Sequence, residues 1–214
     1  MKVTDALKER RSVRAFLPTP VEEEKLTAIF EAAARTPSWA NSQPWELFVA
    51  TGETLARIKE SYIEKYASGV AGTPETPRPK EWTQLAVERQ KQLRPDMLRD
   101  CGDAVEQFGA LNQAMFGAPT VVYICMDKVL SEWSLYDIGA YSQSVMLAAT
   151  EYGLGTIPAI TLTHFPDILH KELEIPENLK VTIGIALGYT DTEHGINNFV
   201  SARSETDKVV HFFK

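Results

Sequence analysis

The sequence predicts a single domain that mixes α-helices and β-strands, and two observations lead to this expectation. The chain has 214 residues, and chains usually divide into several domains only above roughly 250–300 residues. Segments with the periodicity of amphipathic helices also alternate with short apolar runs that are typical of strands. The composition, 44% hydrophobic and 24% charged, is ordinary for a globular protein and excludes a mainly disordered chain.

The N-terminal part is expected to hold two helices and one strand. Residues 3–10 form a short amphipathic pattern, and residues 21–35 form a stronger one with three glutamates in its first turn, where they favour the positive end of the helix dipole. Pro37 ends this second helix. Residues 46–51 are a predicted strand, which Gly52 closes.

Residues 61–117 are less regular and are predicted to form a helical excursion, or lid, over the surface. A loop is expected at 69–79, a polar helix at 80–93, and a further helix beginning near Pro95. The apolar content is too low for a core of its own, so this segment is not expected to be a separate domain.

The C-terminal half supplies most of the predicted sheet. Residues 120–126 are apolar on both faces and are therefore expected to form a central strand. Residues 136–152 form a helix that is apolar nearly all round, which indicates burial on most sides. Further strands are predicted at 156–160 and 181–187, with a short helix at 167–173 between them.

Charge and motif content exclude several classes of function. The net charge of −7 argues against a nucleic-acid or anionic-membrane partner. No apolar run approaches the ~18 residues needed to span a bilayer, and the N-terminal residues are charged, so a cytoplasmic protein is expected. Cys101 and Cys125 form no CxxC pattern, and the histidines show no metal-ligand spacing, so no metal site is expected.

Nucleotide and hydrolase motifs are also missing. The chain contains no GxxxxGK[ST] phosphate loop and no GxSxG nucleophile motif. Gly153 and Gly155 begin a GxG pattern, but Pro158 occupies the place of its third glycine and the pattern follows a helix. A Rossmann dinucleotide site is therefore not expected.

A cluster of three arginines, Arg10, Arg11 and Arg14, with Ser12 among them, is the first candidate site. Guanidinium groups bind phosphate oxygens in a bidentate manner, and a hydroxyl adds a neutral donor. In an acidic chain the cluster indicates a ligand that carries phosphate. The alternative is a solvated helix C-terminus whose cations favour the helix dipole.

The segment 37–45, PSWANSQPW, is the second candidate. Its amide and hydroxyl side chains, together with Trp39 and Trp45, suit a planar heteroaromatic ligand with hydrogen-bonding edges. The alternative is a helix-to-strand loop that contains a buried tryptophan.

The order and spacing of these motifs resemble the FMN-dependent nitroreductase family. RRSVR precedes PSWANSQPW by about 23 residues, and the likeness continues through Asp137-Ile138-Gly139, Gly153-Leu154-Gly155 and Ser201-Ala202-Arg203. It covers nearly the whole chain and is weakest over 61–110. The resemblance implies an α+β, three-layer α-β-α fold with a central, mainly antiparallel sheet.

The resemblance also implies a set of residues that bind FMN. Arg10, Arg11, Ser12 and Arg203 match phosphate and ribityl ligands, and Arg14 matches a cation near the pyrimidine edge of the flavin. The loop that reaches the flavin from the other subunit is matched by Pro37, Ser38, Trp39, Asn41 and Gln43. The segment whose backbone lies near flavin N5 is matched by Pro158, Ala159, Ile160 and Thr161.

Two positions depart from the family pattern. Ser201 stands where a second basic residue is frequent, so phosphate binding would depend more on Arg10 and Arg203. Ile160-Thr161 replaces a glutamate–glycine pair of some members, so a charged side chain over the pocket mouth is missing.

The implied assembly is an obligate homodimer with two FMN sites at its interface. The tail 204–214 is expected to pack on the partner subunit, because its four large apolar side chains need cover and an added strand removes an exposed sheet edge. Helix 136–152 would form the dimer core.

The implied activity is ping-pong transfer of hydride from NADH or NADPH, through FMN, to nitro compounds, quinones or similar acceptors, with no catalytic side chain. Alternatives are the deiodinase-type and flavin-fragmenting chemistry of the same superfamily, or a non-catalytic flavin-binding protein.

Overall fold

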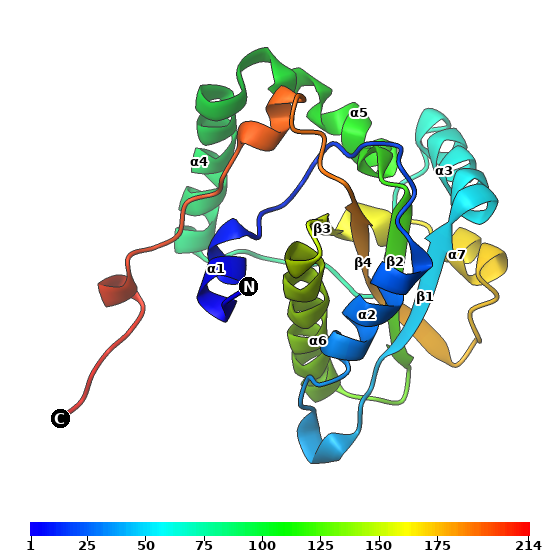
Figure 1. Ribbon diagram of the computed structural model, residues 1–214, viewed down its shortest axis with the longest axis horizontal. Coiled ribbons are helices and arrows are strands. Elements are labelled where there is room, and N and C mark those ends of the chain that lie inside the picture. The colour runs from blue at the N-terminus through cyan, green and yellow to red at the C-terminus, as the bar shows by residue number, and fades with distance from the viewer.

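A four-stranded antiparallel sheet forms the centre of the computed structural model, which describes residues 1–214 (Figure 1). Its strands are β1 (Glu46–Thr51), β2 (Thr120–Asp127), β3 (Gly155–Ala159) and β4 (Leu179–Gly188). Their order is β1-β2-β4-β3, and each neighbouring pair is antiparallel. The four predicted strands and the mainly antiparallel sheet are therefore confirmed, and β1 and β3 are the two edges.

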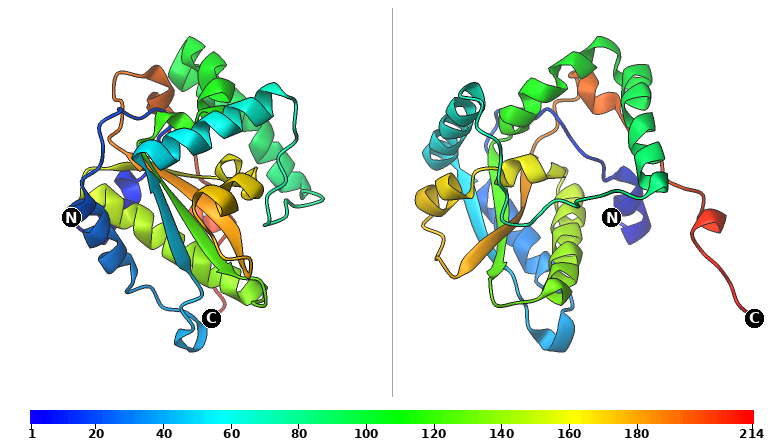
Figure 2. Two further views of the ribbon diagram at one scale, coloured as in Figure 1. Left: turned by 90° about the vertical axis from the view of Figure 1, so that its right-hand side faces the viewer. Right: turned by 180° about the vertical axis from the view of Figure 1, so that it is seen from behind.

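Helices cover both faces of this sheet, which confirms the three-layer arrangement (Figure 2). The helices α2 (Glu23–Ala33) and α6 (Glu132–Glu151) lie on one face, and α3 (Gly52–Ala67) and α7 (Pro166–Glu172) lie on the other. Buried side chains of β2 alternate between the two layers: Val121, Tyr123 and Cys125 pack with α3 and α7, and Val122, Ile124 and Met126 pack with α2 and α6. The strand is thus buried on both faces, as its apolar run predicts.

The excursion begins later than the sequence predicts. Residue 61 lies within α3, a helix that was not predicted from the sequence. Leu55, Ile58 and Tyr62 of this helix are buried in the core. Residues 61–67 therefore belong to the layer on the sheet. Beyond them, the chain crosses the back of the molecule and enters α4 (Gln84–Cys101), as the view from behind shows (Figure 2).

The prediction of two helices separated near Pro95 was wrong, because α4 continues through this proline. Pro95 cannot donate to the carbonyl of Lys91, but both residues are exposed, so water can satisfy that carbonyl. One face of α4 packs against the segment before the tail, in a small cluster with Ala15, Ile196 and Phe199.

The remaining helices lie at the periphery. They are α1 (Val3–Glu9), which packs on α6, and α5 (Phe108–Gln113). The tail beyond residue 200 runs away from the body (Figure 1). None of the helices combines the length and the apolar character that crossing a bilayer requires.

Candidate functional site

The arginine cluster of the N-terminal segment and Arg203 of the C-terminal segment meet at one cavity of about 430 Å³. The residues that line it include Arg10, Arg11, Ser12, Arg14, Gln143, Phe199, Ser201 and Arg203. Two contacts hold the N-terminal segment in place, one with β3 and one with the C-terminal segment. Ser12 forms a parallel bridge with Thr156 of β3, and the backbone N–H of Arg14 donates to Oδ1 of Asn197 at 2.7 Å.

The cavity is cationic and lacks counter-ions. Arg10, Arg11 and Arg203 form no salt bridge, although the chain carries seven more acidic than basic residues. Burial and the charge of Arg203 lower the pKa of Arg10 below its usual value. Guanidinium groups that disfavour one another in this way fit a bound anion, and phosphate matches their donor geometry.

Arg14 lies deeper than the other arginines. Its guanidinium is 5.2 Å from the ring centroid of Phe199, and Nη1 donates to the carbonyl of Ser12 at 2.9 Å. Nε is buried and has no partner within the chain, and burial lowers the pKa of this residue. A buried cation with an unused donor fits a ligand that offers an acceptor atom.

The 37–43 loop is held in an unusual backbone conformation. Ala40, Asn41 and Gln43 have φ values of +51°, +56° and +45°, which L-residues rarely adopt. The N–H of Gln43 donates to Oγ of Ser38 at 2.9 Å, which closes the loop on itself. Non-glycine residues fixed in this region of φ are enriched at ligand sites.

Within one chain, this loop does not reach the arginine cavity. It follows α2 at the lower end of Figure 1, whereas α1 and the segment around residue 200 lie to the left. The lining of the arginine cavity contains no residue of the loop. The predicted site residues of one copy are therefore divided between two places on its surface.

Pro158 and Ala159 lie in β3 and pair with Ile185 and Gly184 of β4. Ile160 and Thr161 begin the 3-10 helix Ile160–Thr163 that follows. None of the four lines the arginine cavity, but Thr156, two residues before Pro158, forms the bridge with Ser12. β3 therefore connects this segment to the arginine cluster.

Several contributing residues were missed by the sequence reasoning. Gln143 of α6 and Phe199 line the arginine cavity, and Asn197 binds the backbone of Arg14. The hydroxyl of Thr161 donates to Oδ1 of Asn112 in α5 at 3.0 Å. Only Gln143 carried a signal in the sequence, because it is a polar residue four positions after Gly139 and therefore on the same face of a largely apolar helix.

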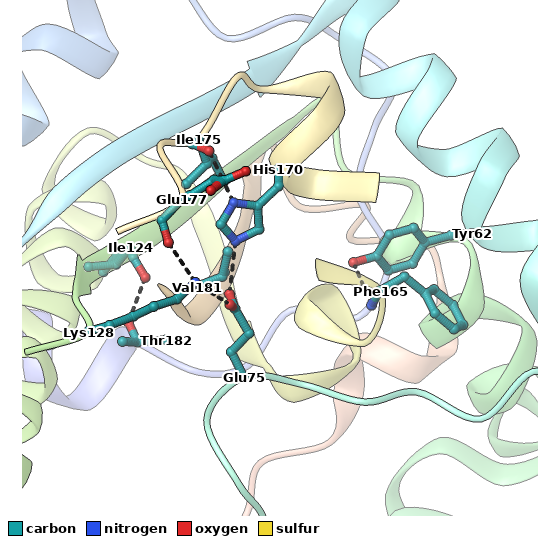
Figure 3. Close-up of polar contacts among 10 residues, drawn as sticks. All are labelled: Tyr62, Glu75, Ile124, Lys128, Phe165, His170, Ile175, Glu177, Val181 and Thr182. Carbon is teal, nitrogen blue, oxygen red and sulfur yellow. Dashed lines mark hydrogen bonds and ion pairs between the residues drawn. The ribbon is translucent and has the colours of Figure 1, made fainter. Parts of the chain in front are cut away.

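A second polar cluster lies at the edge of β4, next to α7 (Figure 3). The carboxylate of Glu75 accepts from the backbone N–H of Val181 at 2.7 Å, contacts Nε2 of His170 at 3.1 Å and lies 3.6 Å from Nζ of Lys128. Val181 lies in the part of β4 that β3 does not pair, so Glu75 satisfies a free edge. This cluster fastens the 69–83 segment to the sheet. No group of three or more potential ligands here or elsewhere could hold a metal ion.

The structure thus combines a helix-covered antiparallel sheet with a cationic cavity whose chemistry fits a phosphate-bearing cofactor. Residues 7–189 match the sequence profile of the Nitroreductase family, and the chain belongs to this family. The resemblance on which the sequence analysis relied is therefore confirmed.

Characterised relatives agree with this assignment. The 4-nitrobenzoate reductase of Pseudomonas putida is 29% identical over 95% of this chain and 92% of its own length. The FMN- and NADPH-dependent nitroreductase NfnB of Sphigopyxis sp. strain HMH is 28% identical, with a TM-score of 0.91 over 100% of both chains. The FMN-dependent NfnB of Mycobacterium smegmatis, solved with NADPH, is 28% identical with a TM-score of 0.90, over 99% of this chain and 98% of that one.

Proposed function

We propose that the protein is an FMN-dependent oxidoreductase that uses NADH or NADPH to reduce nitro compounds, quinones or similar acceptors. The observation that carries the proposal is the cavity in which unpaired guanidinium groups from both ends of the chain meet. Its chemistry fits the phosphate of FMN, and the solved relatives with high structural similarity are FMN- and NADPH-dependent nitroreductases.

The side chains of this cavity bind and orient the cofactor. Arg10, Ser12 and Arg203 would hold its phosphate, and Arg14 would lie at the pyrimidine edge with its unused Nε donor. FMN, when bound, supplies the chemistry: it accepts hydride from NAD(P)H and passes the electrons to a second substrate. A fixed cation near the pyrimidine edge favours the additional negative charge of the reduced ring.

The other predicted contacts act through the backbone and through a second copy. The backbone of the 158–161 segment would lie beside the reactive edge of the ring. The 37–43 loop would complete the site of the partner subunit, since it cannot reach the arginine cavity of its own chain. The functional unit is then a homodimer with two equivalent sites.

The tail supports this dimer. Phe212 and Phe213 are 85% and 95% exposed, and nothing in the same chain covers them. β1 is an edge strand, and next to it lies a cleft whose mixed lining includes Leu26 and Phe30 of α2 and Leu55 of α3. The tail and this edge lie on opposite sides of the molecule (Figure 1). We infer that the 204–214 tail of one subunit covers the β1 edge of the other.

The two free thiols support a cytoplasmic location. Cys101 and Cys125 are buried and free, which is usual in a reducing compartment, and burial raises the pKa of Cys125 to about 12. We infer that the protein acts in the cytoplasm. Cell fractionation of the native source tests this.

Stopped-flow absorbance tests the function directly. The protein saturated with FMN is mixed with NADH or NADPH without oxygen, and bleaching of the flavin absorbance is expected. A nitroaromatic compound or a quinone is then added, and the absorbance should return. If neither nucleotide bleaches the bound flavin, the protein is not a reductase of this kind.

A further inference from the structure

Three aromatic side chains surround a cavity of about 500 Å³ that adjoins the 37–43 loop, and two of these rings, Trp133 and Tyr136, have no role in the proposed cofactor site. The cavity is lined by Pro37, Ser38, Trp39, Trp133, Tyr136 and Asp137. Trp39 belongs to the 37–43 loop, whereas Trp133 and Tyr136 lie in the first turns of α6. The indole rings of Trp39 and Trp133 have centroids 6.0 Å apart and planes tilted by 53°.

These rings are not part of the core. Within one chain, Trp39, Trp133 and Tyr136 are 69%, 67% and 76% exposed, so a large aromatic area around one concave site is left uncovered by the chain's own residues. An exposed apolar patch of this kind marks a binding surface. The neighbouring Trp45 provides the contrast, because it stacks on Tyr141 at 4.4 Å and packs against the core.

The cavity walls are held rigidly. The N–H of Trp39 donates to Oδ2 of the buried Asp137 at 3.2 Å, and the φ values of the following residues fix the loop. Trp133 and Tyr136 stand on a twenty-residue helix whose opposite face is packed in the core. Rigid aromatic groups bind flat ligands with little loss of conformational freedom.

We propose that Trp133 and Tyr136, together with Trp39, form the binding wall for the aromatic ring of the electron acceptor. This inference rests on the proposed function, in which the 37–43 loop lies beside the flavin of the partner subunit. The cavity, which this loop helps to line, would then lie beside the same flavin. Nitro groups withdraw electrons from an aromatic ring. Such electron-poor rings stack favourably on the electron-rich faces of tryptophan and tyrosine.

The wall is also neutral at its surface, since Asp137 is only 4% exposed. The ligand class is therefore a planar, electron-poor arene such as a nitrobenzene, held by stacking rather than by ion pairing. A small acceptor without an aromatic ring, such as ferricyanide, gains nothing from the wall.

Equilibrium dialysis of nitrobenzene against the oxidised, FMN-loaded protein tests this without turnover. Trp133→Ala and Tyr136→Ala are each expected to raise the Kd by about three- to tenfold. The KM for nitrobenzene should rise by a similar factor, while the rate of flavin reduction by NAD(P)H and turnover with ferricyanide stay at the wild-type values. Trp133→Phe should restore most of the affinity.

Trp82→Ala is the matched control, because Trp82 is an exposed tryptophan outside this cavity, and it should bind nitrobenzene as the wild type does. An unchanged Kd in both cavity variants overturns the inference. An equal rise of the Kd in Trp82→Ala also overturns it. The same holds if the loss of nitrobenzene binding in the cavity variants is proportional to their loss of FMN. Failure of the wild type to bind nitrobenzene, while NAD(P)H still reduces its flavin and ferricyanide reoxidises it, overturns the acceptor wall but not the oxidoreductase.

Discussion

The carboxylate of Asp137 in α6 accepts a hydrogen bond from the backbone N–H of Trp39, with 3.2 Å between Oδ2 and N. Asp137 is buried, and no cation pairs with it. Its hydrogen bond from Trp39 therefore fixes the backbone of the 37–43 loop against α6, which is a positioning role. The loop that it holds contains three residues with positive φ, a conformation that needs support from its surroundings.

Asp137→Ala is therefore expected to loosen the 37–43 loop and to weaken FMN retention, while thermal stability changes little. The alanine leaves the N–H of Trp39 without its partner, but Trp39 is exposed, so water can satisfy that donor. Fluorescence titration of FMN into the apoprotein measures the affinity. Asp137→Asn keeps an acceptor oxygen and should bind FMN more tightly than Asp137→Ala; equal affinities in the two variants would contradict the positioning role.

Arg10→Ala and Arg203→Ala should each weaken FMN binding. A charge-assisted hydrogen bond contributes about 1.5–3 kcal/mol, which corresponds to roughly ten- to a hundredfold in Kd. The same fluorescence titration gives the values. Arg99→Ala is the control, because Arg99 pairs with Asp96 and Asp100 on the surface of α4. Unchanged affinity in both cavity variants would remove the phosphate assignment.

The elements that the sequence predicted well are those whose pattern depends on burial alone. β1 matched its predicted bounds, and the apolar run of β2 correctly indicated a central strand. α3 was missed because Gly52, taken as the end of a strand, is also the first residue of the helix, although Leu55, Ile58 and Tyr62 follow helical spacing.

For the site, the sequence predicted the arginine cluster, but only the fold brings Arg203 to it. Contacts between distant segments, such as Asp137 with Trp39 or Asn197 with Arg14, leave no local periodicity. They depend on the packing of α6 and of the C-terminal segment, which residue spacing does not encode. The aromatic wall was missed for the same reason, since Trp133 and Trp39 are far apart in the chain.

Glu75→Ala should destabilise the attachment of the 69–83 segment. The N–H of Val181 then loses its acceptor, at a cost of about 1–3 kcal/mol for an unsatisfied buried group. Glu75→Gln keeps an acceptor oxygen and should retain most of the stability. Urea unfolding gives the free energies, and amide hydrogen exchange at Val181 should accelerate in the alanine variant alone. Equal exchange rates in the two variants would show that the carboxylate does not protect this strand edge.

Replacement of both tail aromatics, Phe212→Ser with Phe213→Ser, should weaken the proposed dimer. Each ring that becomes covered by the partner contributes roughly 1.5–3 kcal/mol of burial. Sedimentation velocity over a range of concentrations would detect the shift toward monomer. Val129→Ser is the control, because Val129 is 89% exposed in the turn after β2 and belongs neither to the tail nor to the cleft beside β1. A dimer of undiminished affinity in the double variant would show that the tail does not hold the subunits together.

His164 should make stability depend on pH near neutrality. Its ring joins the 69–83 segment to α3: Nε2 contacts Nη2 of Arg78 at 2.5 Å, and Nδ1 contacts the hydroxyl of Tyr66 at 2.9 Å. Because arginine can only donate, Nε2 must accept, and Nδ1 then carries the proton. Burial and the charge of Arg78 lower the pKa of His164 below the usual value of a histidine.

A lowered histidine pKa means that the unfolded chain takes up a proton more readily than the folded protein does. The contribution of His164 to stability is thus complete above about pH 6.5 and is lost as the pH falls toward and through the folded pKa. Thermal unfolding at constant FMN concentration should show a steeper fall from pH 7 to 5 in the wild type than in His164→Gln. His211→Gln, at an exposed histidine, should keep the wild-type slope. If His164→Gln also keeps the wild-type slope, protonation of His164 does not make the stability depend on pH.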